Sequence, residues 1–213
     1  MAPVTEFVQT TLKPGVPLEP IYKAFEAIKA AAGNQIVRAS PLHDNPEQFR
    51  LFIDWDSLEA HQAFRATEAY PKFMSEVAPY VAAPSKVVHF ELTPFPPTVL
   101  DKSPVTEIFQ MYFEPDADEA KNLAAAKKVA GDITAGGFAG ATGLSAVGWT
   151  IEKDIDYKGE KARVLTALIG WESVEAHRAA MQKDSFKQIT SYFQTGTQGI
   201  KGFDMTYVSP KPI

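Results

Sequence analysis

Short stretches of the chain alternate between apolar and mostly polar residues, and other stretches place apolar residues at helical spacing. From residue 49 to residue 55 every second side chain is apolar, which is typical of a strand with one face on a core. From residue 21 to residue 32 apolar residues recur at steps of four, three and four, which is typical of a helix lying on that core. The whole pattern predicts strands at residues 4–11, 36–40, 49–55, 86–92, 105–113, 144–153, 162–171 and 202–208, and helices at 17–32 and 57–80 and from about 117, 174 and 185.

One seven-residue stretch at a strand–helix junction occurs twice. Trp55–His61 reads Trp-Asp-Ser-Leu-Glu-Ala-His, and Trp171–His177, 116 positions later, reads Trp-Glu-Ser-Val-Glu-Ala-His. The first predicted strand is repeated as well, because Val4–Gln9 resembles Val105–Gln110, 101 positions later. Two repeated landmarks in the same order indicate a duplicated unit, with about 15 extra residues (116 − 101) in the second copy. The serine in each stretch is a good helix N-cap, so the stretch is expected to dock each helix on its sheet.

Both halves have the element order β-α-β-β-α-β, which predicts an α+β fold of two ferredoxin-like units fused in tandem. The domains are expected at residues 1–93 and 105–213, joined by a proline-rich linker at residues 94–104. The second face of each sheet also carries apolar residues, such as Phe52 and Leu168. The two antiparallel sheets are therefore expected to pack on each other and close an intramolecular α/β barrel.

The repeated Trp-x-Ser-x-Glu-Ala-His stretch resembles the dimeric α/β-barrel superfamily, and it is most similar to the antibiotic-biosynthesis-monooxygenase (ABM) branch. The resemblance covers nearly the whole chain as two fused units and implies a pseudo-dimer within one polypeptide. It also implies a small-molecule pocket between sheet and helices in each half. Relatives of this kind include cofactor-independent monooxygenases acting on polyketide quinols, haem-degrading enzymes, aromatic polyketide cyclases and stress-responsive proteins. The resemblance does not choose among these activities.

Composition removes several classes of function. A net charge of −5 without clustered Lys and Arg argues against nucleic acid as a partner. The chain has no cysteine, so it offers no disulfide framework, no thiolate nucleophile and no sulfur metal ligand. No apolar run approaches the roughly 18 residues that span a bilayer, and no signal peptide precedes the first strand. The expected protein is cytoplasmic, binds a small molecule and not a membrane, and has a further homodimer as an open alternative.

The histidines are the candidate acid–base groups at neutral pH. His61 and His177 lie on the helix face that meets the sheet, so each is either a hydrogen-bonded core residue or a base lining a pocket. His89 lies on the fourth predicted strand, and the offset of 116 aligns it with Met205. This difference indicates either acid–base work by His89 at one working site, with a degenerate site in the other half, or simply a strand residue near Glu91. His43 is expected to be an exposed loop residue.

Aromatic residues are the candidate substrate contacts. Phe64, Tyr70, Tyr80 and Trp149 are predicted to line pockets, with core packing as the alternative for each. Phe64 aligns with Ala180, which predicts unequal space beneath the two helices. Tyr192 is a further candidate. The matching carboxyl groups of Glu6 and Glu107 face either a polar interior or an edge.

The sequence predicts no cofactor and no metal site. No His-x-x-x-His pair lies on a helix, and no histidine is singled out as an axial ligand for haem. The glycines between Gly136 and Gly143 lack the spacing of a dinucleotide or phosphate loop, and they are expected to form a mobile flap over the second pocket. Two functions therefore remain: a cofactor-independent monooxygenase or polyketide cyclase acting on an apolar oxygenated molecule, or a non-catalytic ligand-binding or stress-related protein.

Overall fold

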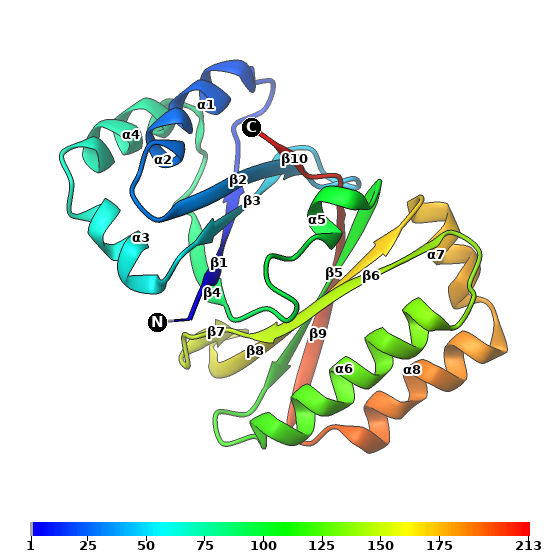
Figure 1. Cartoon of the computed structure of the whole chain (residues 1–213). Helices are drawn as coiled ribbons and strands as arrows, with labels where there is room; N and C mark the ends of the chain where they lie inside the picture. Colours follow the sequence, from blue (N-terminus) through cyan, green and yellow to red (C-terminus); the bar gives the residue numbers. More distant parts are fainter. Residues whose placement is uncertain (1) are drawn as a thin grey trace. The chain divides into compact units, whose positions relative to one another are not determined.

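The computed structural model describes residues 2–213. The alternating stretch around residue 51 is a central strand of one of its two sheets, which belongs to the first of two compact units. This unit comprises the residues up to Phe90 together with Pro210–Ile213. Its elements are the strands β1 (Val4–Thr11), β2 (Asn34–Pro41), β3 (Gln48–Trp55), β4 (Lys86–Phe90) and β10 (Lys211–Pro212), and the helices α1 (Glu19–Ala24), α2 (Glu26–Lys29), α3 (Leu58–Arg65), α4 (Ala69–Val77) and η1 (Ala78–Tyr80). The strand order is β10-β2-β3-β1-β4, and α1 to α4 lie on one side of the sheet (Figure 1).

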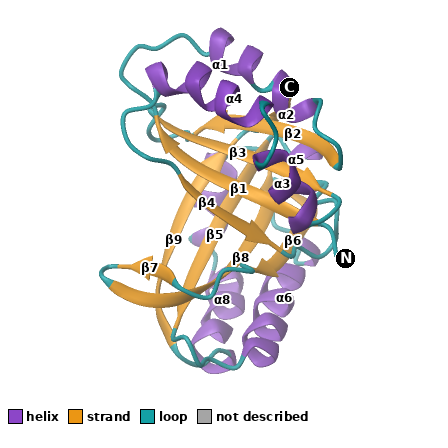
Figure 2. Cartoon of the chain, turned by 90° about the vertical axis from the view of Figure 1, so that its left-hand side faces the viewer, coloured by secondary structure: helices purple, strands orange, loops and turns teal. Residues whose placement is uncertain are grey.

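The second unit, Glu91–Ser209, repeats this arrangement. Its elements are the helices α5 (Val99–Lys102), α6 (Glu119–Ala135), α7 (Val174–Met181) and α8 (Asp184–Gly196), and the strands β5 (Val105–Phe113), β6 (Ala141–Trp149), β7 (Ile155–Tyr157), β8 (Glu160–Trp171) and β9 (Ile200–Val208). The strand order is β6-β8-β5-β9, with β7 paired to β8. Helices α6 and α8 run side by side on one face of this sheet (Figure 2).

The two sheets share one register. Val4 pairs with Trp55 in the first unit, and Val105 pairs with Trp171 in the second. Because side chains alternate across a strand, this shared register turns the same repeat positions toward the helices in both units. The predicted fold class of two tandem ferredoxin-like units with antiparallel sheets is confirmed. Among residues 2–213, no helix is long and apolar enough to cross a membrane.

The segment predicted as a linker, residues 94–104, is grouped with the second unit, which begins at Glu91. The fourth strand of the first unit ends at Phe90, and Glu91 and Thr93 donate backbone hydrogen bonds to residues of β6 instead. Val99 and Leu100 of α5 are completely buried, and α5 lies beside β5, β6 and β8 of the second unit. Apolar side chains in the proline-rich segment thus make it part of a packed unit. The last residues of the chain add a short strand to the sheet of the first unit.

The helix predicted at residues 57–80 is divided into α3 and α4 by a break between Arg65 and Ala69. Helix α3 ends at Arg65, and the Thr67 hydroxyl two residues later donates to the carbonyl of Phe64 at 2.7 Å. Pro71 then lies in the first turn of α4, where a helix does not use the missing N–H. Pro71 is therefore accommodated in the first turn and does not interrupt the helix.

Two glycines hold the repeated stretch against its sheet. Gly33 and Gly140 have φ values of +81° and +82°, and a Cβ added to either would lie 2.6 or 2.5 Å from the Cβ of Ala60 or Ala176. Their carbonyls accept the backbone N–H of the residue after each strand tryptophan, at 2.8 and 2.7 Å. The alanine of the repeated stretch thus packs against a glycine in each copy.

The predicted flap at residues 136–143 is wrong. This segment leads into β6 and forms its start, and none of its residues lines the cavity of the second unit.

Replacing Gly33 or Gly140 with Ala should lower the free energy of unfolding by about 2 kcal/mol, because the new residue has a strained left-handed backbone and its Cβ clashes with the alanine Cβ of the helix. Urea unfolding measures this loss. Gly15→Ala and Gly137→Ala are matched controls, since both glycines have positive φ but nothing within 4 Å of the added Cβ. They should show only the smaller conformational cost of about 1 kcal/mol. Equal losses in all four variants would contradict the proposed packing role.

Candidate functional site

Each repeated stretch places its histidine by capping a helix and stacking an indole. The Ser57 hydroxyl accepts the backbone N–H of Ala60 at 3.2 Å, and Ser173 accepts that of Ala176 at 3.0 Å. The ring centroids of Trp55 and His61 lie 5.2 Å apart, and the corresponding distance in the second unit is 4.6 Å. The serine therefore starts the helix, and the tryptophan fixes the imidazole one turn later.

In the first unit, four buried side chains form a chain of polar contacts, which we call the His61 cluster. The Trp55 indole donates to Glu6 Oε2 at 2.8 Å, and the same oxygen lies 3.5 Å from His61 Nε2. The other ring nitrogen of His61, Nδ1, lies 2.7 Å from His89 Nε2. His61 thus contacts a carboxyl group through one nitrogen and a second imidazole through the other. These contacts bring together residues from β1, β3, α3 and β4.

In the second unit, the equivalent side chains form the His177 cluster. The Trp171 indole donates to Glu107 Oε2 at 3.0 Å, and this oxygen lies 3.5 Å from His177 Nε2. His177 Nδ1 lies 2.8 Å from the hydroxyl of Tyr207. The hydroxyl of Tyr207 can also donate to Met205 Sδ at 3.8 Å. Three of the four cluster residues are therefore the same in both units.

The residue that replaces His89 in the second unit is Tyr207, and the predicted counterpart Met205 is wrong. Glu6 pairs across its sheet with His89, whereas Glu107 pairs with Tyr207. Met205 lies two residues earlier, opposite Phe109. The offset between the copies grows from 116 residues at the repeated stretch to 118 at the last strand (207 − 89). The predicted asymmetry itself remains, because a phenol stands where the first unit has an imidazole.

Burial shifts the proton equilibria of the His177 cluster in opposite directions. Burial raises the pKa of Glu107 from 4.5 to about 7, and the hydrogen bond from Trp171 lowers it by a smaller amount. Burial lowers the pKa of His177 from 6.5 to about 4. At neutral pH the imidazole is therefore uncharged, and a large fraction of the carboxyl groups keep their proton. A histidine with this pKa is a weak base.

The His61 cluster has a proton acceptor that the His177 cluster lacks. An imidazole that takes a proton on Nε2 becomes a cation, and its Nδ1–H then needs a strong acceptor. His89 Nε2 can accept that hydrogen bond and can take over the proton, because a neutral imidazole has a basic nitrogen. A phenol can accept a hydrogen bond but does not become protonated near neutral pH. Only the first of these two clusters therefore pairs its histidine with a second base.

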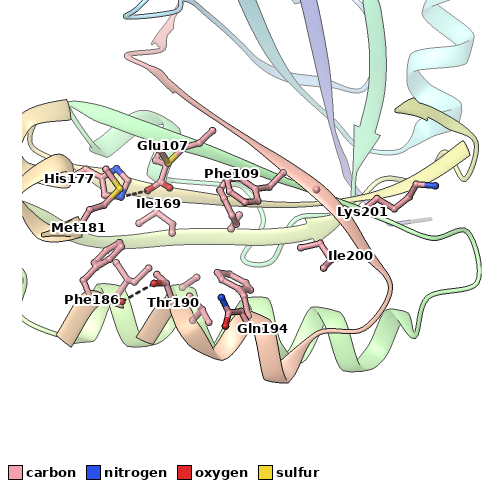
Figure 3. A pocket seen from close by; sticks show the side chains of 18 residues that line it. Glu107, Phe109, Ile169, His177, Met181, Phe186, Thr190, Gln194, Ile200 and Lys201 are labelled. Atoms are coloured by element: carbon pink, nitrogen blue, oxygen red, sulfur yellow. Dashed lines mark hydrogen bonds and ion pairs between the residues drawn. The ribbon is translucent and has the colours of Figure 1, made fainter. Parts of the chain in front are cut away.

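Both clusters lie at the edge of a cavity between sheet and helices. The cavity of the first unit has a volume of about 640 Å³, and that of the second about 520 Å³. Both volumes fall within the range of small-molecule sites. In the second unit, Glu107 and His177 lie together at one end and Ile200 and Lys201 at the other (Figure 3). The side chains between them are mostly apolar, including Phe109, Ile169, Phe186 and Phe193.

The predicted site residues divide by position. His61, Phe64 and Tyr70 line the cavity of the first unit, and His177 lines that of the second, while His89 lies behind His61. Phe64 corresponds to Ala180, which is itself buried but does not line its cavity. These positions leave the predicted roles untested.

Other predicted residues lie away from the cavities. Tyr80 is half-buried and does not line the cavity of the first unit. Trp149 lies in the core of the second unit, where its indole donates to the carbonyl of Glu119 at 3.1 Å and packs on Phe113. Tyr192 is 39% exposed, and His43 is exposed in a loop as expected. Aromatic spacing did not separate core residues from cavity residues.

The His61 cluster also contains a set of potential metal ligands. One ligand atom from each of Glu6, His61 and His89 lies within 4.8 Å of the others, and all three residues are buried. However, His61 directs Nε2 toward Glu6 and Nδ1 toward His89, and one metal ion can bond to only one nitrogen of a ring. The observed arrangement suits a shared proton. Ligation of one ion by all three residues would require a ring to turn.

Known structures resemble the whole chain. A "putative monooxygenase" from Lactobacillus acidophilus has a TM-score of 0.64 at 14% identity, with 100% of this chain and 99% of that chain covered. An anthrone oxidase-like protein gives a TM-score of 0.64 at 13% identity, with 100% and 94% covered. A second protein described like the first, from Fusobacterium nucleatum, gives 0.55 at 11% identity, with 97% and 91% covered.

These likenesses show the fold. The chain has the tandem ferredoxin-like architecture of these proteins over its full length, which confirms the predicted structural resemblance. No protein-family model matches the sequence, and the curated proteins give no match to it.

Proposed function

We propose that the first unit is a cofactor-independent oxygenase for an apolar, oxygenated aromatic molecule, with His61 as the catalytic base. The observation that carries this proposal is the His61–His89 pair, joined at 2.7 Å beside a cavity of about 640 Å³. The substrate class is that of an anthrone, because one structural neighbour is named an anthrone oxidase-like protein. An anthrone carries a CH₂ group between two aromatic rings, opposite a ketone, and its carbanion is stabilised as a phenolate.

In the first step, His61 Nε2 removes a proton from the CH₂ group, and the electron pair moves into the ring system. His61 then carries a positive charge, which the carboxyl group of Glu6 at 3.5 Å and the acceptor nitrogen of His89 stabilise. The first residue of the pair thus takes the proton, and the second holds the imidazole in the required tautomer. This division of roles is the one that general-base histidines commonly show.

In the second step, the carbanion transfers electrons to O₂ and a C–O bond forms at the same carbon. The resulting peroxide takes back the proton from His61 and becomes a hydroperoxide. Loss of the remaining hydrogen of that carbon as a proton breaks the O–O bond and releases hydroxide, which together form water. The balance is one anthrone and one O₂ giving one anthraquinone and one water. The substrate supplies all the electrons.

A non-catalytic binding function is the alternative, and two observations favour it for the second unit. Burial lowers the pKa of His177 to about 4, so this histidine is a weak base at neutral pH. Its cavity is also lined mostly by apolar side chains. The second unit is therefore proposed to bind a related molecule without transforming it.

Oxygen uptake with anthrone tests the oxygenase proposal. Purified protein should accelerate both O₂ consumption and anthraquinone formation in a ratio of one to one above the rate in buffer. Loss of the substrate that continues at the same rate without O₂, with no anthraquinone formed, would instead indicate a cyclase or aldolase type of reaction, in which the carbanion attacks a carbonyl group. No acceleration with anthrone or its hydroxylated derivatives would contradict the enzyme proposal and favour a binding protein.

A further inference from the structure

The last residue of the repeated helix differs between the two units. Arg65 ends α3 and lies four positions after His61, and Met181 ends α7 and lies four positions after His177. Residues four apart lie on the same face of a helix, with their Cβ atoms about 6 Å apart. Arg65 and Met181 each line the cavity of their own unit. The same place beside the histidine thus holds a cation in one unit and a thioether in the other.

Arg65 is positioned by an aromatic group and has no acidic partner. Its guanidinium carbon lies 5.7 Å from the ring centroid of Tyr70, and the Tyr70 ring meets Phe64 edge-on at 5.7 Å. Among residues 2–213, no carboxylate forms an ion pair with Arg65. A planar guanidinium that stacks on an aromatic ring keeps its donors for another group, and carboxylates fit two of these donors at once. This cation is therefore available to a ligand.

The cation that lines the second cavity is already neutralised. Lys201 Nζ lies 3.4 Å from Glu114 Oε2 and also pairs with Glu160. It lies at the opposite end of the cavity from His177 (Figure 3). Met181 offers no charge at the position of Arg65. An anionic ligand in this cavity would find no unpaired cation among the residues that line it.

We propose that Arg65 makes the first cavity selective for an aromatic molecule that carries a carboxylate or another ionised oxygen. The second cavity takes the uncharged relatives. Since Arg65 lies one turn from His61, the ionised group binds at the rim and places the reacting carbon beside the imidazole. This inference rests on the proposed function only in treating the first cavity as the substrate site.

Binding of two matched probes tests the selectivity. 2-Naphthoate and 2-naphthol share a ring system, but only the first is charged at pH 7. Isothermal titration should show that Arg65→Met weakens naphthoate binding about tenfold, the typical value of a charge-assisted hydrogen bond, with less than about twofold change for naphthol. Lys72→Met removes an exposed charge from the same unit outside the cavity and should change neither affinity. Met181→Arg should raise the stoichiometry of naphthoate binding from one to two.

The proposal fails if Arg65→Met binds naphthoate as tightly as the original protein, or if both probes lose affinity equally. It also fails if the original protein shows no saturable naphthoate binding, or if Lys72→Met causes the same loss. The titrations involve no turnover, so their outcome is independent of the anthrone assay. A protein that binds naphthoate through Arg65 but oxidises nothing would keep this inference and overturn the oxygenase proposal.

Discussion

Replacing His61 with Gln is expected to lower the rate of substrate oxidation about 100-fold to 10,000-fold, the usual contribution of a general base. Glutamine keeps similar size and hydrogen-bonding groups, but it cannot take up a proton. The affinity for 2-naphthoate should therefore change little, because Arg65 and the apolar walls remain. The measurement is kcat from O₂ uptake beside the dissociation constant from titration. A loss in kcat without a loss in binding separates a catalytic base from a residue that only shapes the cavity.

Substitutions of the three other histidines test whether the effect is specific to His61. His43→Gln alters an exposed loop residue and should leave turnover unchanged. His89→Tyr copies the second unit, so it should lower kcat and shift the pH dependence of the rate while His61 stays in place. Full activity in His61→Gln would remove the proposed base. Loss of activity in His177→Gln alone would move the working site to the second unit.

The duplicated fold was predictable because its signals are local. The repeated Trp-x-Ser-x-Glu-Ala-His stretch contains the end of a strand, a helix cap and a buried helical histidine in seven consecutive residues. Alternation over residues 49–55 then determined which side chains face the helices, and the observed register agrees with it. The burial of His61 and His177 follows from the same periodicity.

The partners of these histidines were not predictable from local patterns. The contact between His61 and His89 joins residues 28 positions apart, and that between His177 and Tyr207 joins residues 30 positions apart. A constant offset of 116 does not account for the two additional residues that precede the last strand of the second unit. Only the pairing of that strand with β5 showed that Tyr207, and not Met205, stands opposite Glu107.

The proposed difference between Arg65 and Met181 was not predicted, although the sequence contains a signal for it. The two helices align without a gap, so these residues stand at the same position four residues after each histidine. Histidines and aromatic residues carry the usual sequence signals of a site, whereas a basic residue in the last turn of a helix is explained equally well by its interaction with the helix dipole. Whether an exposed arginine also borders a cavity depends on the packing of α4, which brings Tyr70 beneath its guanidinium.

Replacing Glu107 with Gln is expected to change how stability depends on pH. In the folded protein the pKa of Glu107 is about 7, compared with 4.5 for an ordinary glutamate, so between these values the unfolded chain releases a proton that the folded protein keeps. Stability therefore falls as the pH rises from 4.5 to 7, by about 3 kcal/mol at most. Glutamine cannot ionise, and its amide oxygen can still accept the Trp171 indole hydrogen. Glu107→Gln should consequently be the more stable protein at pH 8, by a substantial part of that amount.

The change of stability with pH that remains in Glu107→Gln should be the one caused by His177. Its pKa is about 4 in the folded protein and 6.5 ordinarily, so between these values the unfolded chain binds a proton that the folded protein does not. Stability due to His177 is complete above pH 6.5 and is lost as the pH falls toward 4, opposite in sign to the Glu107 slope. The two slopes largely cancel in the original protein between pH 4.5 and 6.5, and Glu107→Gln should leave only the rise with pH. Urea unfolding between pH 5 and pH 8 measures both curves, with Asp204→Asn on β9 as the exposed control. Parallel curves for Glu107→Gln and the original protein would mean that the Glu107 carboxyl group is already ionised at neutral pH. That result would contradict a protonated Glu107 beside an uncharged His177.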